Sequence, residues 1–159
     1  MEANQIEKLS EATERPQPPA TRRALPMALL QARESVMSRF RPVLHEHGIT
    51  EQQWRVMRVL SENDVLTAMA ISEQANIFAS SLSRILKTLE KHGLVVRLKS
   101  VDDARLTLIR LTEEGHDIID QIAPESLSIY AKLEEELGGG ERIELLISML
   151  NELTELHHK

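Results

Sequence analysis

Apolar residues recur every three or four positions over most of the chain, a spacing typical of amphipathic helices. The first such segment starts near Pro26, a residue suited to the first turn of a helix, and runs to about His47. We expect Pro42 to bend this helix near its end and Gly48 to cap it. Its apolar arc consists of Leu29, Leu30, Val36, Met37, Phe40 and Leu44.

Three further segments predict helices within the next 45 residues. TEQQ at residues 50–53 has the threonine and glutamine of a capping box, and residues 67–76 are short and alanine-rich. SSLSRILKTLEKHG at residues 80–93 is the most periodic run of the chain. Its apolar face holds Leu82, Ile85, Leu86 and Leu89, and its opposite face holds Ser80, Arg84, Lys87 and Lys91, with Ser83 at the flank.

The pattern changes from helical to strand-like after Gly93. LVVRLK at residues 94–99 and LTLIRL at residues 106–111 are aliphatic runs on either side of an aspartate-rich turn, which predicts a β-hairpin. Thr112 then caps a helix of about 25 residues that we expect Pro124 to kink. Glycines at 138–140 break the chain before a final amphipathic helix. The chain is therefore expected to be mainly α with one small hairpin.

Charge is distributed unevenly along the chain, although the formal net charge is −6. Residues 77–112 carry seven basic and three acidic side chains, whereas residues 113–159 carry three basic and twelve acidic ones. The basic segment coincides with the periodic helix and the hairpin. Two short helices followed by a basic hairpin form a winged helix-turn-helix, in which the second helix enters the major groove of DNA.

Eight side chains are predicted to contact DNA. The exposed helix face supplies donors for base edges and phosphates, and an arginine at the hairpin tip can enter a narrow minor groove. The candidates are Ser80, Ser81, Ser83, Arg84, Lys87, Arg97, Lys99 and Arg105. A solvated hairpin with an incidental charge is the alternative for Arg105, and surface charge is the alternative for the lysines and Arg97.

The motifs TEQQWRVMRVL, SSLSRILKTLEKHGLVVR and DARLTLIRLTEEG resemble the MarR family of transcriptional regulators over residues 25–153. Asp103, Arg105, Leu111, Thr112 and Gly115 match the family's wing signature. LLQARESVMSRFRP and the TEQQWR start resemble the homoprotocatechuate-catabolism repressor group in particular. Arg84 stands where that group has glycine, which predicts a different operator.

The resemblance implies a homodimer held by interlocked first and last helices, on a palindromic operator. Wide apolar stripes on the last two helices support this independently, since a winged helix alone cannot cover them. The expected division is a flexible tail at 1–20, an N-terminal helix at 21–48, the winged helix at 49–112, and dimerisation helices at 113–159. The resemblance further implies that Asp103 pairs with an arginine to brace the wing.

Arg33 lies in the middle of the apolar arc of the first helix. Because a buried charge needs a partner, we hypothesise that Arg33 receives the carboxylate of a small phenolic or aryl acid, the effector class that the resemblance implies. Met37, Phe40 and Trp54 would form the apolar walls of that site. The alternatives are that the Arg33 side chain extends to solvent, or that it forms an internal salt bridge to an acidic side chain at the dimer interface.

Other classes of function find little support. No nucleophile with its base, no phosphate loop and no cysteine is recognisable, so we expect neither an enzyme nor a cofactor. Neither His45 with His47 nor His157 with His158 has convincing metal-ligand spacing. No apolar run could span a bilayer and no secretory signal is evident, which predicts a cytoplasmic protein. A winged helix that binds protein instead of DNA remains the alternative.

Overall fold

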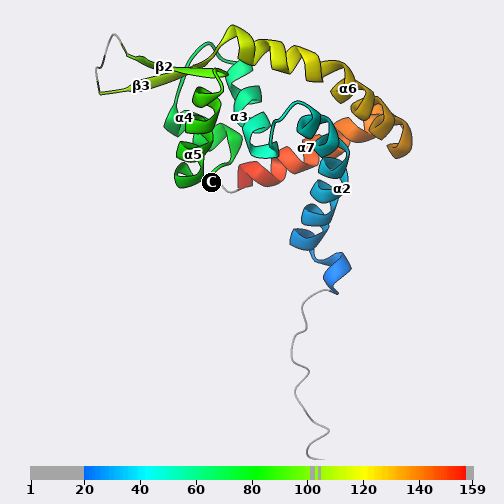
Figure 1. The fold of residues 1–159 in the computed structure, drawn as a ribbon. Helices are drawn as coiled ribbons and strands as arrows, with labels where there is room; N and C mark the ends of the chain where they lie inside the picture. Colours follow the sequence, from blue (N-terminus) through cyan, green and yellow to red (C-terminus); the bar gives the residue numbers. More distant parts are fainter. Residues whose placement is uncertain (1–19, 101–102, 104, 157–159) are drawn as a thin grey trace, which may run out of the picture. The chain divides into compact units, whose positions relative to one another are not determined.

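The computed structural model describes residues 20–100, 103 and 105–156 of the chain (Figure 1). The described chain divides into two compact units, Met1–Ser38 and Arg39–Lys159. The tail predicted at 1–20, apart from Ala20, lies outside the described residues, as do His157 and His158.

The first unit holds a short 3-10 helix, η1 (Thr21–Arg23), and the start of α2 (Leu25–Glu46), which continues into the second unit. α2 passes through Pro42 as one helix. Gly48 has a φ of +68°, and its amide donates to the His45 carbonyl at 2.9 Å. Since only glycine adopts this left-handed conformation without strain, the predicted cap at Gly48 is confirmed.

The second unit contains the winged helix-turn-helix. Its helices are α3 (Glu51–Ser61), α4 (Ala68–Ala75) and α5 (Ala79–Lys91), followed by strands β2 (Val95–Lys99) and β3 (Thr107–Leu111). The hairpin is therefore present, and each strand starts one residue later than predicted. A third strand, β1 (Leu66–Thr67), had not been predicted. It pairs antiparallel with β3, which gives a sheet of order β1-β3-β2.

Threonine starts three of the helices in this unit. The side chains of Thr50, Thr67 and Thr112 each accept a hydrogen bond from the third amide of the helix that follows. At Thr50 the Gln53 side chain also accepts from the Thr50 amide, so the predicted capping box is confirmed. These bonds satisfy amides that the first turn of a helix otherwise leaves without partners.

The core of the second unit is aliphatic and centres on α3, which contacts α4, α5, α6 and β3. Val56, Met57 and Leu60 of α3 are fully buried, as are Leu82, Leu86 and Leu89 of α5. Ile109 of β3 closes the core from the sheet side. Leu44 of α2 and Ile119 and Ile122 of α6 belong to the same cluster, so the core extends from residue 44 to residue 122.

Two long helices complete the fold, α6 (Glu113–Leu137) and α7 (Gly140–Glu155), which contact one another. α6 is one helix through Pro124. The break between them is Gly138 and Gly139, both with positive φ, whereas Gly140 already belongs to α7. Among the described residues, no helix combines the length and the apolar character needed to cross a membrane.

Gly115 joins the start of α6 to the sheet. A Cβ at this position would lie 2.7 Å from Leu111 Cδ2 and closer still to the Leu94 carbonyl oxygen. Beside it, the Thr112 hydroxyl donates to the Gly93 carbonyl at 2.6 Å and accepts from the Gly115 amide at 3.1 Å. The Leu111, Thr112 and Gly115 positions of the wing signature therefore fasten the first turn of α6 to the strand that begins the hairpin.

Candidate nucleic-acid interface

The recognition helix candidate, α5, is divided cleanly into two faces. Leu82, Ile85, Leu86 and Leu89 are buried against the rest of the unit. The exposed side chains include the five candidates on this helix, Ser80, Ser81, Ser83, Arg84 and Lys87, and also Lys91. The amphipathic division read from the sequence is thus present, and the polar face is open to a partner.

The turn before α5 is held by side chains from its neighbours. The guanidinium of Arg55 on α3 donates to the carbonyls of Ala75 at 3.0 Å and Asn76 at 3.3 Å. Asn76 adopts the left-handed conformation that ends α4, and the Ser72 hydroxyl donates to the Ile77 carbonyl at 2.6 Å. Because three separate contacts fix this turn, the angle between α4 and α5 is set by the fold itself.

The tip of the wing is organised around Asp103. Its carboxylate accepts from the Arg105 amide at 2.9 Å, and its own amide donates to the Ser100 hydroxyl at 3.3 Å. The Leu106 amide closes the turn on the Asp103 carbonyl. An aspartate in a tight turn commonly bonds its own backbone two residues on, as Asp103 does here. The pairing of Asp103 with an arginine side chain, which the resemblance implied, stays a prediction.

Arg105 is exposed at this tip. The hydrogen bond from the Arg105 amide to Asp103 fixes the backbone of Arg105 and does not involve its side chain. The strands β2 and β3 extend beyond the helices of their own unit (Figure 1). This position suits a side chain that reaches a groove next to the one entered by α5.

Arg97 is already engaged by a neighbour. Its Nε lies 3.1 Å from Glu90 Oε2, so the ion pair joins β2 to α5. The Arg97 side chain is 35% exposed and the Glu90 side chain 43% exposed. Ion pairs that are this accessible to water contribute little to stability. Arg97 can therefore exchange Glu90 for a phosphate at low cost, whereas Lys99 is exposed at the next position on the same side of the strand.

Arg110 was not among the predicted contacts, although it is exposed on β3. It lies opposite Val96, while Arg97 lies opposite Ile109. Because facing residues of paired strands share a side of the sheet, Arg110 is on the side opposite to Arg97 and Lys99. The period of two in residues 106–111 could have indicated this cation as a further candidate.

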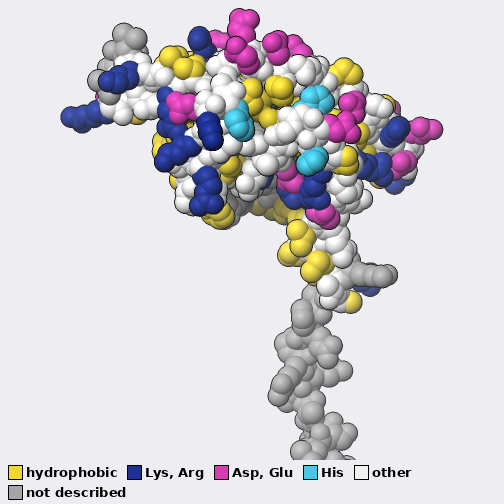
Figure 2. All heavy atoms as spheres, in the orientation of Figure 1, with side chains coloured by type: hydrophobic (Ala, Val, Ile, Leu, Met, Phe, Trp, Pro, Cys, Tyr) yellow, Lys and Arg dark blue, Asp and Glu magenta, His cyan; other side chains and the backbone are white. Residues whose placement is uncertain are grey.

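The two signs of charge occupy different parts of the second unit. Lys and Arg gather over the α5 and hairpin end, and Asp and Glu gather over α6 (Figure 2). The first turn of α6 carries Glu113 and Glu114, which complement the positive end of its dipole. A polyanion such as DNA is therefore attracted to the α5 and hairpin end of this unit and repelled from α6.

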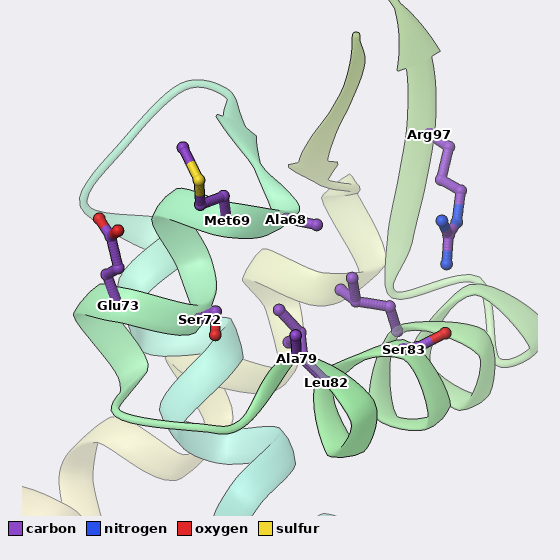
Figure 3. A pocket seen from close by; sticks show the side chains of 9 residues that line it. Ala68, Met69, Ser72, Glu73, Ala79, Leu82, Ser83 and Arg97 are labelled. Carbon is purple, nitrogen blue, oxygen red and sulfur yellow. The ribbon is translucent and has the colours of Figure 1, made fainter.

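A pocket opens beside α5, between that helix, α4 and β2 (Figure 3). It encloses about 350 Å³ and its wall is mostly apolar, with Met69 and Leu82 among the lining residues. Ser83 and Arg97, two of the predicted DNA contacts, also line it. The pocket thus adjoins the exposed face of α5.

The residues proposed for an effector site fall in both units. In the first, Arg33 is exposed and Met37 is partly buried. In the second, Phe40 is buried and its ring centroid lies 5.1 Å from that of Tyr130, while Trp54 packs against the core. Arg33 is exposed although it lies in the middle of the apolar arc of the helix. A helical wheel does not say how much of an arc is covered.

Two polar features near the end of α2 remain. Arg39 Nη2 lies 2.6 Å from Glu136 Oε2, and this hydrogen bond raises the pKa of Arg39 and lowers that of the Glu136 carboxyl. His47 Nδ1 lies 3.0 Å from the Val43 carbonyl oxygen. Within the described ranges, no three His, Asp or Glu side chains gather in a way that could hold a metal ion.

Comparisons with known proteins agree with this architecture. The profile of the MarR family matches residues 49–107. The chain is 44% identical over 130 residues to the HTH-type transcriptional regulator FarR of Neisseria gonorrhoeae, covering 82% of this chain and 88% of that one. It is 38% identical over 133 residues to the homoprotocatechuate degradative operon repressor of Escherichia coli, covering 84% and 89%.

Among solved structures, NadR in complex with 4-hydroxyphenylacetate superimposes with a TM-score of 0.76 at 42% identity, covering 86% of this chain and 95% of NadR. FarR is a transcriptional regulator and the E. coli relative an operon repressor, and neither is an enzyme. Identity at this level over nearly the whole length of the relatives, together with the winged helix and its matching wing signature, leaves one conclusion: the chain belongs to the MarR family of transcriptional regulators.

Proposed function

We propose that this protein is a ligand-responsive repressor that binds a palindromic double-stranded DNA operator as a homodimer and leaves it when a small aromatic carboxylate binds. The observation that carries the proposal is the exposed polar face of α5, whose serines, Arg84 and Lys87 lie over a fully buried apolar face. Hydroxyls and guanidinium groups on such a face can donate to base edges and phosphates in the major groove.

The hairpin completes the proposed DNA surface. Arg105 at the tip is the candidate for the minor groove, and Lys99 and Arg97 are candidates for phosphate contacts. The acidic side chains of α6 and α7 oppose any other orientation of the unit on DNA, because like charges repel. The operon repressor of E. coli, at 38% identity, supports repression as the outcome.

The homodimer rests on apolar surface that the chain leaves uncovered. None of the residues of α7 is buried, although the helix carries several large apolar side chains. The exposed ones are Leu145, Leu146, Ile147, Met149 and Leu153 on this helix and Leu156 directly after it, and α6 adds Leu127, Tyr130 and Leu137. A second copy of the chain covers such a surface symmetrically and presents two α5 helices to successive turns of a duplex.

The effector is proposed to be a phenolic or aryl acid, the class to which the 4-hydroxyphenylacetate bound to NadR belongs. Arg33 is the proposed partner of its carboxylate, with Met37, Phe40 and Trp54 as apolar walls. Arg58 is a rival for the same role, because it lies one helical turn after Trp54 on α3 and is partly exposed. Its guanidinium is paired with Glu62 at 2.9 Å, a partner that a ligand carboxylate can replace.

A binding selection tests the DNA-binding part of the proposal. Purified protein is mixed with random fragments of genomic DNA, and the bound fragments are sequenced. The proposal requires a recurrent inverted repeat with half-sites about one helical turn apart. Equal recovery of all fragments would contradict sequence-specific binding. The same result would favour the winged helix that binds protein instead of DNA.

Titration of the operator complex tests the effector. 4-Hydroxyphenylacetate should release the DNA, and the neutral alcohol analogue should not, because it lacks the carboxylate that a guanidinium binds. Arg33→Ala and Arg58→Ala are compared in the same assay. The variant that needs a much higher acid concentration identifies the carboxylate partner, and release unchanged in Arg33→Ala removes Arg33 from the mechanism.

A further inference from the structure

Phe78 is the most exposed of the large apolar side chains in the described part of the chain, at 85%. It is the residue immediately before α5. Phe78 takes no part in the aromatic pair of this structure, which joins Phe40 and Tyr130. An isolated phenyl ring in water is unfavourable, and this one stands at the entrance to the helix proposed to read DNA.

The position of Phe78 makes it costly for the helix as well. It is the N-cap residue of α5, and no side chain caps the first turn. The other three helices of the winged helix and its continuation, α3, α4 and α6, all have threonine caps. Serine, threonine, aspartate and asparagine stabilise a helix start, and phenylalanine does not. The recognition helix candidate thus departs from the pattern that its own neighbours follow.

The residues around Phe78 allow a close approach to DNA. Ala79, Ser80 and Ser81 follow it and are small and exposed. The Phe78 carbonyl accepts from the Ser81 and Leu82 amides at 2.9 Å, so its backbone is fixed to the first turn. The N-terminal end of a recognition helix is the part that meets base edges in the major groove. There, the C5-methyl of thymine is the apolar group that a phenyl ring can contact.

We propose that Phe78 reads a thymine methyl group in each half-site of the operator. This inference rests on the proposed DNA binding and extends it to one residue and one base. Contact with the methyl group removes the ring from water, which favours binding. The free protein keeps an exposed ring at an uncapped helix start because this position serves DNA binding. Cytosine and the purines offer no methyl group at the corresponding place.

The test replaces thymine by deoxyuracil, which removes the methyl and keeps every hydrogen-bonding group. An operator duplex obtained from the binding selection is prepared with each thymine replaced in turn, symmetrically in both half-sites. Dissociation constants are measured by fluorescence anisotropy at constant salt. Burial of one methyl corresponds to about a fourfold change in affinity. Replacement of thymine by deoxyuracil at one position should therefore weaken binding of the wild-type protein about fourfold per half-site.

Phe78→Ser separates this role from a structural one. Serine is a good N-cap, so the variant should unfold at a higher temperature than the wild type. It should nevertheless bind the thymine and deoxyuracil duplexes equally well. Met69→Ser is the matched control, because Met69 is 72% exposed on α4 and its replacement should leave the thymine preference unchanged.

Two outcomes would overturn the inference. One is a Phe78→Ser variant that keeps the full loss of affinity at the sensitive thymine. The other is a Phe78→Ser variant whose oligomeric state on light scattering differs from that of the wild type, because the ring would then lie in a contact between protein copies. If the wild-type protein enriches no fragment at all, the proposed function fails and not the role of Phe78 within it.

Discussion

α5 and α7 are both amphipathic, yet they dispose of their apolar faces in opposite ways. α5 buries four aliphatic residues in its own chain and leaves a polar face outside. α7 buries none of its residues and leaves large aliphatic side chains outside. Similar patterns in the sequence therefore have different outcomes: the fold covers the apolar face of α5 and leaves that of α7 exposed. Under the proposed function, the polar face of α5 meets DNA and the apolar face of α7 meets a second copy of the chain.

The largest effect is expected from the buried face of α5. Leu86 is 1% exposed, and Leu86→Ala should lower the free energy of unfolding by about 2–5 kcal/mol because it leaves a cavity in a packed core. Urea unfolding monitored by circular dichroism measures the change. Met69→Ala, at an exposed position of α4, serves as the control and should differ from the wild type by less than about 0.5 kcal/mol. A small effect at Leu86 would break the contrast between the two helices.

The exposed face of α7 comes next. Leu146→Glu places a charge in the proposed dimer interface and should weaken operator binding by about a hundredfold, because a buried unpaired charge dissociates the pair. Light scattering should show monomers at concentrations where the wild type is dimeric. Ser148→Glu adds the same charge on the polar side of α7 and should leave both properties unchanged. A dimer that survives Leu146→Glu would remove this face from the assembly.

A smaller loss is expected at the wing. Arg105→Ala should weaken operator binding by about tenfold, since the variant loses one charge-assisted contact in each half-site. Anisotropy at fixed salt measures the loss, and light scattering checks that the dimer is intact. Arg110→Ala removes an exposed cation from the other side of the hairpin and should cost less. Equal losses would mean that net charge, and not the position of the tip, is what DNA detects.

The smallest effect concerns the ion pair between Arg39 and Glu136. The hydrogen bond from Arg39 lowers the pKa of Glu136, so the pair stabilises the fold at neutral pH. That contribution is lost as the pH falls through the lowered pKa, below the ordinary range of a glutamate. Glu136→Gln should make thermal stability slightly less dependent on pH in the acidic range. An unchanged pH profile would indicate that solvent screens the pair completely.

Local patterns predicted most of the fold. Capping by Thr50 and Thr112, the left-handed glycine after α2 and the two faces of α5 all follow from residues close in sequence, and all are present. β1 could not be predicted in this way. It has two residues and exists because Leu66 pairs with Ile109, more than forty residues away. No local periodicity records such a pairing.

The exposed residues of the candidate site could be predicted from the sequence, but their ion pairs and hydrogen bonds could not. Exposure of Ser80, Arg84 and Lys87 follows from the helical period. The pairing of Arg97 with Glu90 depends on how β2 folds back over α5, and the bond from Arg105 to Asp103 depends on the turn itself. The exposure of Phe78 could not be predicted either, because an aromatic residue beside apolar neighbours is usually buried.

The close fit at Gly115 has a mechanical consequence. No room is left for a methyl between the first turn of α6 and the Leu94 carbonyl, and the Thr112 hydroxyl bonds the Gly93 carbonyl, so the start of the hairpin is tied to the start of α6. We therefore expect a rotation of α6 to carry the hairpin with it. In the proposed homodimer, a shift between the two copies would then change the position of both wing tips.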